Sequence, residues 1–282
     1  LARYRANFFM QKRGIGAVFR EIPQKILSLD ELGLPSVLKN LALLPKGLVL
    51  VTGPTGSGKS TTLAALVDYV NKIRKDHILT IEDPIEFVHE PQNCLINQRE
   101  VGRDTMSFSA ALRGALREDP DIILVGEMRD LETIQLALEA AETGHLVFAT
   151  LHTISASKTI DRIIEVFPGD LQGQIRSGLA DSLRAIIAQN LFKRIDQPGR
   201  VAGIEILIAT PAVRNLIREN KIFQINSVIE TGRKFGMQSI DDAIMKLLTA
   251  GMIDPEQAYN KAATKSKFRE FLVTPPQDFT EV

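Results

Sequence analysis

Short apolar runs alternate with amphipathic segments through the middle of the chain. The runs 48–51, 78–81, 122–125 and 146–149 have the length and composition of strands that are buried on both faces. Between the last two, Leu131, Ile134, Leu138 and Ala141 recur at helical spacing, and Gly144 follows as a C-cap. Residues 93–103 predict an irregular segment, and residues 107–116 predict a helix. Strands that alternate with helices predict an α/β fold with a parallel sheet covered on both faces.

The first part of the chain has a β pattern. Residues 2–10 and 17–22 predict strands that a turn at 11–16 separates, and residues 23–28 predict a linker. Two strands alone are only marginally stable. Because the sequence begins at Leu1, inside a predicted strand, we expect this pair to be the end of a larger N-terminal domain.

The last third changes pattern. The apolar positions between 170 and 191 predict one amphipathic helix, and residues 201–209 predict a strand. Thr210 and Pro211 are an N-cap and a proline at N1, and the chain beyond them predicts a helical region with few strands. The tail 273–282 contains Pro275 and Pro276 and few apolar residues, so it predicts disorder.

Residues 53–60 spell GPTGSGKS between an apolar strand and a predicted helix, which is the context of a phosphate-binding P-loop. The glycines let backbone N–H groups turn toward a phosphate, and the helix N-terminus adds partial positive charge. The chemistry of the motif assigns phosphate to Lys59 and Mg²⁺ to the Ser60 hydroxyl. The predicted nucleotide-binding residues are Gly53, Pro54, Thr55, Gly56, Ser57, Gly58, Lys59, Ser60 and Thr61.

Composition limits the class of protein. The chain has 282 residues, 34 basic and 34 acidic side chains and a net charge of zero, so bulk charge does not favour nucleic acid or an anionic membrane. Its one cysteine, Cys94, excludes an internal disulfide and a multi-cysteine zinc site, and fits a reducing cytosol. No apolar run approaches the roughly 20 residues of a membrane-spanning helix.

Two acidic segments follow predicted strands. The first acidic segment runs from Glu82 to Glu86 and follows the predicted strand 78–81. The second contains Glu127 and follows the predicted strand 122–125. Because the carboxyl ends of parallel strands face the ligand-binding crevice, both are expected near the phosphates. Glu86 is the candidate general base, and Glu127 the candidate Walker-B residue, holding Mg²⁺ directly or through water. The Walker-B aspartate is replaced here by Gly126. The alternative is that both glutamates are solvated loop residues.

The histidines and arginines indicate function less specifically than the P-loop and the two acidic segments do. His152 follows a strand end, where it can sense the γ-phosphate, and His145 lies at a helix–strand junction; both could equally be structural. His77 and His89 are interpreted as surface residues. P-loop enzymes often receive an arginine from a neighbouring subunit, and composition does not choose among the candidates. These are Arg3, Arg5, Arg13, Arg20, Arg99, Arg103, Arg113 and Arg117.

Four motifs in order make the chain resemble the type II/type IV secretion ATPase superfamily. They are GPTGSGKST (53–61), the aspartate box TIEDPIEF (80–87), the Walker-B region DIILVGEMRD (121–130) and the histidine box TGHLVFATLHT (143–153). The resemblance covers nearly the whole chain. It implies a RecA-like ATPase domain at 29–210 with a helical C-terminal region at 211–272. Residues 1–23 would end a PAS-like α+β domain, 24–28 would be the linker, and 273–282 the tail.

Within the superfamily the chain is most similar to the motors that retract type IV pili. Their surface motif AIRNLIRE resembles residues 212–219, namely Ala212, Val213, Arg214, Asn215, Leu216, Ile217, Arg218 and Glu219. The four-cysteine zinc motif usual in the extension and secretion motors is replaced by the cysteine-free stretch 195–199. Without the family, residues 212–219 would be an ordinary amphipathic surface helix.

The resemblance also implies roles and partners. Glu86, Glu127, His145 and His152 would be catalytic, Arg5 and Arg20 would reach the nucleotide, and ATP and Mg²⁺ would be bound. The resemblance further implies that the chain forms a hexamer in the cytoplasm, peripheral to the inner membrane. It also implies that the partner of this hexamer is a platform protein at the base of the pilus. The alternatives are an accessory retraction paralogue or another secretion ATPase, a RecA-like nucleic-acid motor, and a scaffold that binds ATP without hydrolysing it.

Overall fold

The structure is a computed structural model of the chain, and it describes residues 3–22 and 25–274. Two compact units make up the chain. The first comprises Leu1–Leu48 and Ser60–Thr150, and the second comprises Val49–Lys59 and Leu151–Val282. The glycine-rich loop therefore belongs to the unit formed by the last part of the sequence. The domain boundaries inferred above stay predictions.

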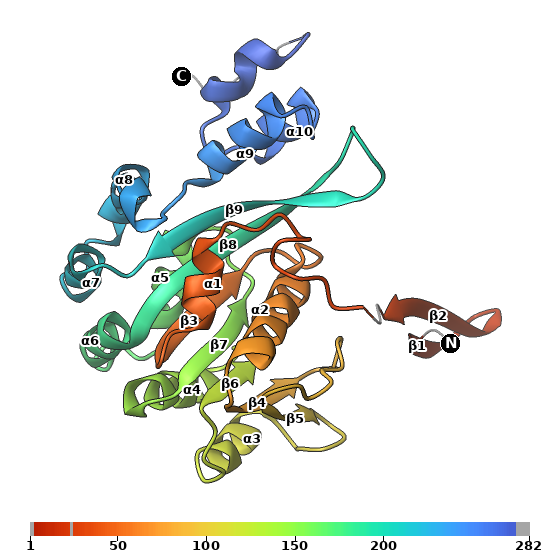
Figure 1. The fold of residues 1–282 in the computed structure, drawn as a ribbon, viewed down its shortest axis with the longest axis vertical. Coiled ribbons are helices and arrows are strands. Elements are labelled where there is room, and N and C mark those ends of the chain that lie inside the picture. The colour runs from red at the N-terminus through yellow and green to blue at the C-terminus, as the bar shows by residue number, and fades with distance from the viewer. Residues whose placement is uncertain (1–2, 23–24, 275–282) are drawn as a thin grey trace. The chain divides into compact units, whose positions relative to one another are not determined.

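Seven strands form one sheet in the order β5-β4-β6-β7-β3-β8-β9 (Figure 1). Pairing is parallel from β5 to β7 and antiparallel between β8 and β9, so the predicted α/β class is confirmed. The strands are β3 (Gly47–Thr52), β4 (His77–Glu82), β5 (Leu95–Glu100), β6 (Ile122–Val125), β7 (Leu146–Leu151), β8 (Leu183–Lys193) and β9 (Arg200–Ile208).

The register of β4, β6 and β7 brings their carboxyl ends to one edge of the sheet. Ile81 pairs with Val125, and Val125 pairs with Ala149. Every residue of β6 and of β7 is buried, as expected for central parallel strands. The segments that follow β4 and β6 therefore start close together, as predicted for the two acidic segments.

Helices connect the strands of the first unit. Most of α2 is buried, and its buried residues include the polar Thr62, Asp68 and Asn71 beside the apolar ones. The Ser107 hydroxyl accepts from the Ala110 N–H at the start of α3, and Gly144 ends α4 with φ of 135°, as predicted for a C-cap. These helices are α1 (Val37–Ala42), α2 (Lys59–Ile73), α3 (Phe108–Ala115) and α4 (Leu131–Thr143).

The second unit is helical beyond Thr210, as predicted. The Thr210 side chain caps α7 and Pro211 is its first residue. Phe192 of β8 packs with Ile244, Tyr259 and Phe268 in a small core under the last helices. The helices are α5 (Ala156–Glu165), α6 (Gln172–Ser182), α7 (Pro211–Arg218), α8 (Ile225–Thr231), α9 (Ile240–Thr249) and α10 (Pro255–Lys261), with 3₁₀ turns at Ile222–Gln224, Arg233–Phe235 and Lys265–Phe271.

The prediction of one helix over 170–191 is wrong. Helix α6 ends at Ser182, and the chain continues directly as the strand β8. The run Ala185–Ala188 is buried throughout, as in a strand covered on both faces. Such a run also contains apolar residues at helical spacing, so periodicity alone does not distinguish the two structures.

Two further predictions are corrected. Residues 93–103 were expected to be irregular, but 95–100 form β5, an edge strand whose polar residues hide its pattern. The turn expected at 11–16 is shorter, because β2 begins at Gly14. The hairpin of β1 (Arg3–Gln11) and β2 (Gly14–Ile22) is antiparallel and largely exposed, and its origin in a larger domain stays a prediction. Residues 23–24 of the linker and 275–282 of the tail lie outside the described residues.

Candidate nucleotide site

The P-loop runs from the end of β3 to the start of α2. Gly53, Gly56 and Gly58 have φ of 142°, 77° and 89°, which L side chains rarely adopt. The Lys59 ammonium donates to the carbonyls of Gly53 at 2.8 Å and Pro54 at 3.1 Å, so it lies over its own loop. The sequence motif therefore forms the curved loop that its spacing predicts.

Strand β8 supports this loop through Gln189, a buried residue that the sequence did not single out. Its Nε2 donates to the Ser57 carbonyl at 2.7 Å. A Cβ atom at Gly53 would lie 2.3 Å from the Gln189 carbonyl oxygen, and one at Gly58 would lie 2.8 Å from Nε2. The loop thus rests directly on β8. No sequence signal marks Gln189, since the contact joins segments 132 residues apart.

Buried polar atoms in and beside the loop fit a phosphate ligand. Ser57 Oγ and Thr52 Oγ1 are buried, and within the described part of the chain neither has a hydrogen-bond partner. Buried hydroxyls without partners are costly, and a bound anion can accept hydrogen bonds from them. No three His, Cys, Asp or Glu side chains among the described residues converge on a metal position. Mg²⁺ needs no such cluster, because it commonly takes one or two protein ligands with phosphate and water. An Mg²⁺ ion held by Ser60 and Glu127 therefore stays a prediction.

The aspartate-box loop after β4 is held by two side chains of β5. Gln98 accepts from the His89 N–H at 2.8 Å and donates to the Phe87 carbonyl at 2.9 Å. Glu100 accepts from the Ile85 N–H at 3.1 Å. The loop that carries Glu86 is therefore fixed at both ends. The sequence analysis missed both supports, because β5 itself was not predicted.

Two carboxylates of this segment have different surroundings. Glu82 accepts from Thr80 Oγ1 at 2.7 Å, from Gln98 Nε2 at 3.1 Å and from the Glu86 backbone N–H. Burial, and to a smaller extent the nearby Glu86 carboxylate, raise the pKa of Glu82. The half-buried Glu86 carboxylate makes no hydrogen bond or ion pair within the described residues. Glu82 therefore holds the loop in place, and the role of Glu86 as general base stays a prediction.

Glu127 follows β6 at a tightly packed point. The Gly126 N–H donates to the Ile81 carbonyl at 2.7 Å, and a Cβ at Gly126 would lie only 3.0 Å from that oxygen. This close approach explains why the usual aspartate is replaced here. Thr150 Oγ1 donates to the Gly126 carbonyl, and Arg129 donates to Glu127 Oε2 at 2.6 Å. Glu127 is thereby placed at the joined ends of β4, β6 and β7.

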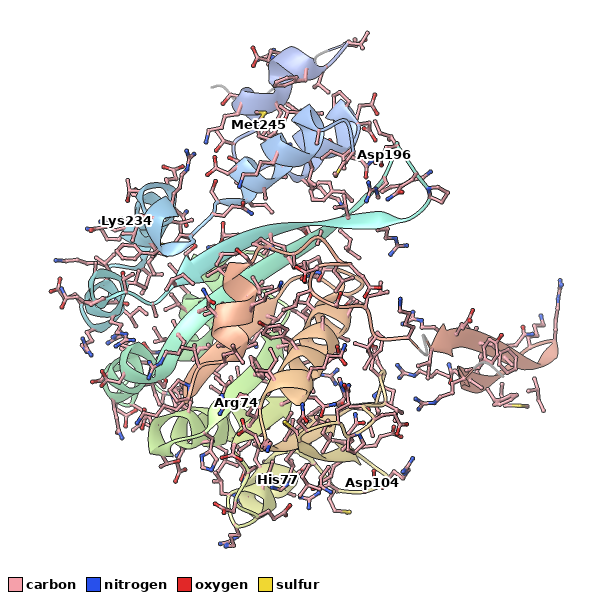
Figure 2. The ribbon with its side chains drawn as sticks, viewed as in Figure 1. Arg74, His77, Asp104, Asp196, Lys234 and Met245 are labelled. Carbon is pink, nitrogen blue, oxygen red and sulfur yellow. The ribbon has the colours of Figure 1, made fainter. Side chains whose placement is uncertain are left out.

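The two histidines of the histidine box lie in different surroundings. His145 Nδ1 lies 2.9 Å from the Ala140 carbonyl at the end of α4, and its catalytic role stays a prediction. His152 is exposed and lies just beyond the end of β7. His77, labelled in Figure 2, begins β4 at the opposite end of the strand from the acidic segments, with Nε2 2.8 Å from Asn97 Oδ1.

The interpretation of His89 as a surface residue is wrong. Its side chain is only 7% exposed, although it lies in the loop between β4 and β5. Nδ1 is buried and has no hydrogen-bond partner in the described chain. Burial lowers the pKa of His89 to about 4, against a smaller opposing effect of Asp68. His89 is therefore neutral in the folded protein near pH 7.

This burial predicts a loss of stability in mild acid. The unfolded chain protonates His89 near pH 6.5, whereas the folded chain protonates it near pH 4. Its stabilising contribution is thus complete above pH 6.5 and decreases as the pH falls toward 4. Between pH 7 and 5, we expect the wild type to lose about 2 kcal/mol more in free energy of unfolding than His89→Gln. Urea unfolding at both pH values measures this. His77→Gln should keep the wild-type pH sensitivity; an equal loss in wild type and His89→Gln would contradict the prediction.

Arg5 and Arg20 are directly opposite each other in the β1–β2 register, and both are exposed. Opposite residues share a face of the pair, where two like charges are unfavourable. Neither arginine forms an ion pair within the described residues, and their role toward the nucleotide stays a prediction. Among the other candidates, Arg99 pairs with Glu118 at 2.8 Å, Arg103 with Asp104 at 3.1 Å, and Arg113 with Glu132.

Helix α7 contains most of the 212–219 segment. Val213 and Ile217 are fully buried, whereas Leu216 is half-buried. Asn215 Nδ2 donates to Glu219 Oε1 at 2.7 Å, and Arg218 pairs with Asp181. The predicted apolar face is confirmed, and it points into the unit. The exposed residues are Ala212, Asn215, Arg218 and Glu219.

Known proteins resemble the chain over most of its length. A family model described as "Type II/IV secretion system protein" matches residues 14–260. The type IV pilus retraction ATPase PilT of Pseudomonas aeruginosa is 61% identical over 268 residues, covering 95% of this chain and 78% of the relative. A twitching motility protein of Neisseria gonorrhoeae is 61% identical over 262 residues, covering 93% and 70%.

A solved structure agrees with the fold. A crystal structure of the pilus retraction motor PilT with bound ADP superposes with a TM-score of 0.87 at 48% identity, covering 94% of this chain and 75% of the other. Fold, phosphate loop and sequence similarity thus lead to the same conclusion. The chain belongs to the type II/IV secretion system protein family and is one of its ATPases.

Proposed function

We propose that the chain is the subunit of a hexameric motor that couples ATP hydrolysis to type IV pilus retraction and so to twitching motility. The observation that carries the proposal is the combination, in one chain, of a P-loop supported on β8 with an AIRNLIRE-like segment presented on α7. The similarity to PilT over 95% of the chain supports the same assignment. Net charge zero does not favour a nucleic-acid motor.

Each site residue has a proposed task. Lys59 and the loop N–H groups bind the phosphates, and Ser60 and Glu127 hold Mg²⁺, which supplies charge neutralisation when bound. Glu86 accepts the proton of the attacking water. His152 senses the γ-phosphate, while Arg5 and Arg20 contribute positive charge to the nucleotide. Closure and reopening of the subunit would then follow binding and hydrolysis as rigid-body rotation.

The proposed assembly is a homo-hexamer in the cytoplasm, peripheral to the inner membrane. Its proposed partners are the platform protein at the base of the pilus and a paralogue of the PilU type, which the chain resembles at 44% identity. None of the helices in the described part of the chain has the length and apolarity needed to cross a membrane.

Exposed changes on α7 should separate hydrolysis from retraction. We expect Asn215→Ala combined with Arg218→Ala to leave ATPase activity and oligomer mass within about twofold of wild type and to abolish twitching. The reason is that both side chains are exposed and lie on the helix surface away from the core. Steady-state ATPase assays, light scattering and twitching zones of a complemented retraction mutant measure these effects.

The buried face of α7 provides the matched control. Val213→Ala and Ile217→Ala remove core methyl groups, so they should lower the melting temperature. Ile217 belongs to the buried apolar face of α7, so its replacement tests stability and not the partner surface. If the exposed double variant twitches normally, α7 is not the partner surface. If it loses ATPase activity in parallel with twitching, the separation fails.

A further inference from the structure

A single buried carboxylate joins the starts of two helices in the second unit. Glu205 of β9 is 7% exposed, and its Oε1 accepts from the Ala156 N–H at 2.7 Å. The Ile240 backbone N–H also donates to this carboxylate. Ala156 is the first residue of α5 and Ile240 the first of α9. One side chain thus accepts from two helix N-termini that are distant in sequence.

Neither helix needs Glu205 as its ordinary N-cap. Ser155 accepts from the Lys158 N–H to cap α5, and Ser239 accepts from the Asp242 N–H to cap α9. Burial raises the pKa of Glu205, and the two backbone N–H groups oppose that change. A buried carboxylate is costly unless it is well paired. The observed arrangement therefore indicates a connection between the helices beyond simple capping.

On one side, this connection leads to the histidine box. Thr153 Oγ1 lies 2.6 Å from Thr159 Oγ1, and Thr159 Oγ1 donates to the Ser155 carbonyl at 2.7 Å. The segment between β7 and α5 is thereby fixed to the first turn of α5. His152 immediately precedes that segment, so its backbone position depends on where α5 begins.

On the other side, the connection leads to the C-terminal helices. Gln238 and Ile206 exchange backbone hydrogen bonds at 2.8 and 3.1 Å, which join the start of α9 to β9. Asp241 of α9 accepts from the N–H groups of Ala263 at 2.8 Å and Thr264 at 3.1 Å, beyond α10. The polar contacts are thus continuous from the histidine box to the end of α10.

We propose that Glu205 is a positioning residue for ATP hydrolysis, which holds the segment 152–156 in place by tethering the start of α5 to the start of α9. This inference rests on the proposed function of the chain as an ATPase motor. Glu205 contacts the two helix N-termini and acts on the reaction through the position of His152. The segment 152–156 and the start of α9 then move as one body.

The test uses Glu205→Gln in the full-length protein. Glutamine has nearly the same shape as glutamate, but only one of its two terminal atoms is an acceptor. Its oxygen can accept from the N–H of one helix, whereas its amide N–H₂ would face the N–H of the other helix and lose that hydrogen bond. We expect kcat for ATP to fall about tenfold and KM to stay within twofold, because the P-loop residues are unchanged. Amide hydrogen exchange should become faster at either Ala156 or Ile240.

Asp241→Asn is the matched control. Asp241 is also a buried carboxylate that accepts from backbone N–H groups in this unit, but its partners lie beyond α10. The Asp241→Asn variant should lower the melting temperature about as much as Glu205→Gln does, and its kcat should stay within twofold of the wild type. Glu205→Gln with wild-type kcat, or an equal loss of kcat in Asp241→Asn, would overturn the proposal.

Hydrogen exchange separates failure of this inference from failure of the proposed function. If the wild type hydrolyses no ATP, the proposed function is wrong. Slow exchange at both Ala156 and Ile240 in the wild type would still support the tether, and fast exchange at either amide would overturn it even if the enzyme is active.

Discussion

Replacement of Glu86 by glutamine should reduce kcat for ATP hydrolysis about 100-fold or more, with ATP affinity almost unchanged. A positioned general base contributes on the order of 10²- to 10⁴-fold, and glutamine cannot accept the proton. The loop should stay in place, because Gln98 and Glu100 hold its backbone and Glu82 accepts from the residue 86 N–H. Single-turnover hydrolysis and binding of a fluorescent nucleotide measure the two effects separately.

Glu90 offers a control carboxylate close by in the sequence. It is exposed, and Glu90→Gln should hydrolyse ATP at the wild-type rate. If Glu86→Gln also retains its rate, the base is another group, and Glu127→Gln becomes the next test. Size-exclusion mass on the same samples shows whether a loss of activity reflects a loss of assembly.

Gly53→Ala should reduce ATP affinity on the order of 100-fold. Alanine at this position needs a φ of 142°, and its Cβ would lie 2.3 Å from the Gln189 carbonyl oxygen and 2.6 Å from Ser57 Oγ. The Gln189 backbone cannot move easily, because β8 is paired with β9 at Ile204. Keeping the loop in its binding conformation would therefore cost a few kcal/mol, which appears as lost affinity. Isothermal titration with a non-hydrolysable ATP analogue measures it.

Gly199→Ala is the matched control for backbone strain. Gly199 has a φ of 123°, but a Cβ there meets no atom within 4 Å, and the residue lies in the turn between β8 and β9. The Gly199→Ala variant should bind the ATP analogue with the affinity of the wild type. If Gly53→Ala binds as tightly as the wild type, the loop does not rest on β8 in solution as described.

Much of the fold could be predicted, because its strongest signals are local. The buried strands β3, β4, β6 and β7 are apolar runs bounded by polar or glycine residues. The caps at Ser107 and Gly144 are equally local. β8 could not be distinguished from a helix, since a strand covered on both faces has no period of two to reveal it. β5 was missed for the opposite reason, because it is a polar edge strand.

The sequence predicts reactive groups for the site, but it does not predict the residues that support them. The P-loop spacing and the strand-end position of Glu127 follow from the sequence. The supports provided by Gln98, Glu100 and Gln189 depend on which strands are neighbours, and one sequence does not contain that information. Burial of His89 likewise depends on the path of a loop that only the tertiary structure defines.

The contact between Gln189 and the P-loop has a consequence for biosynthesis. The loop leaves the ribosome 132 residues before the side chain that supports it. At typical translation rates of about 5–20 residues per second, this delay is roughly 7 to 26 seconds. During that interval the nascent chain carries the complete nucleotide-binding motif without the surface on which it rests. ATP can therefore stabilise this protein only late in its synthesis, once β8 has emerged and paired.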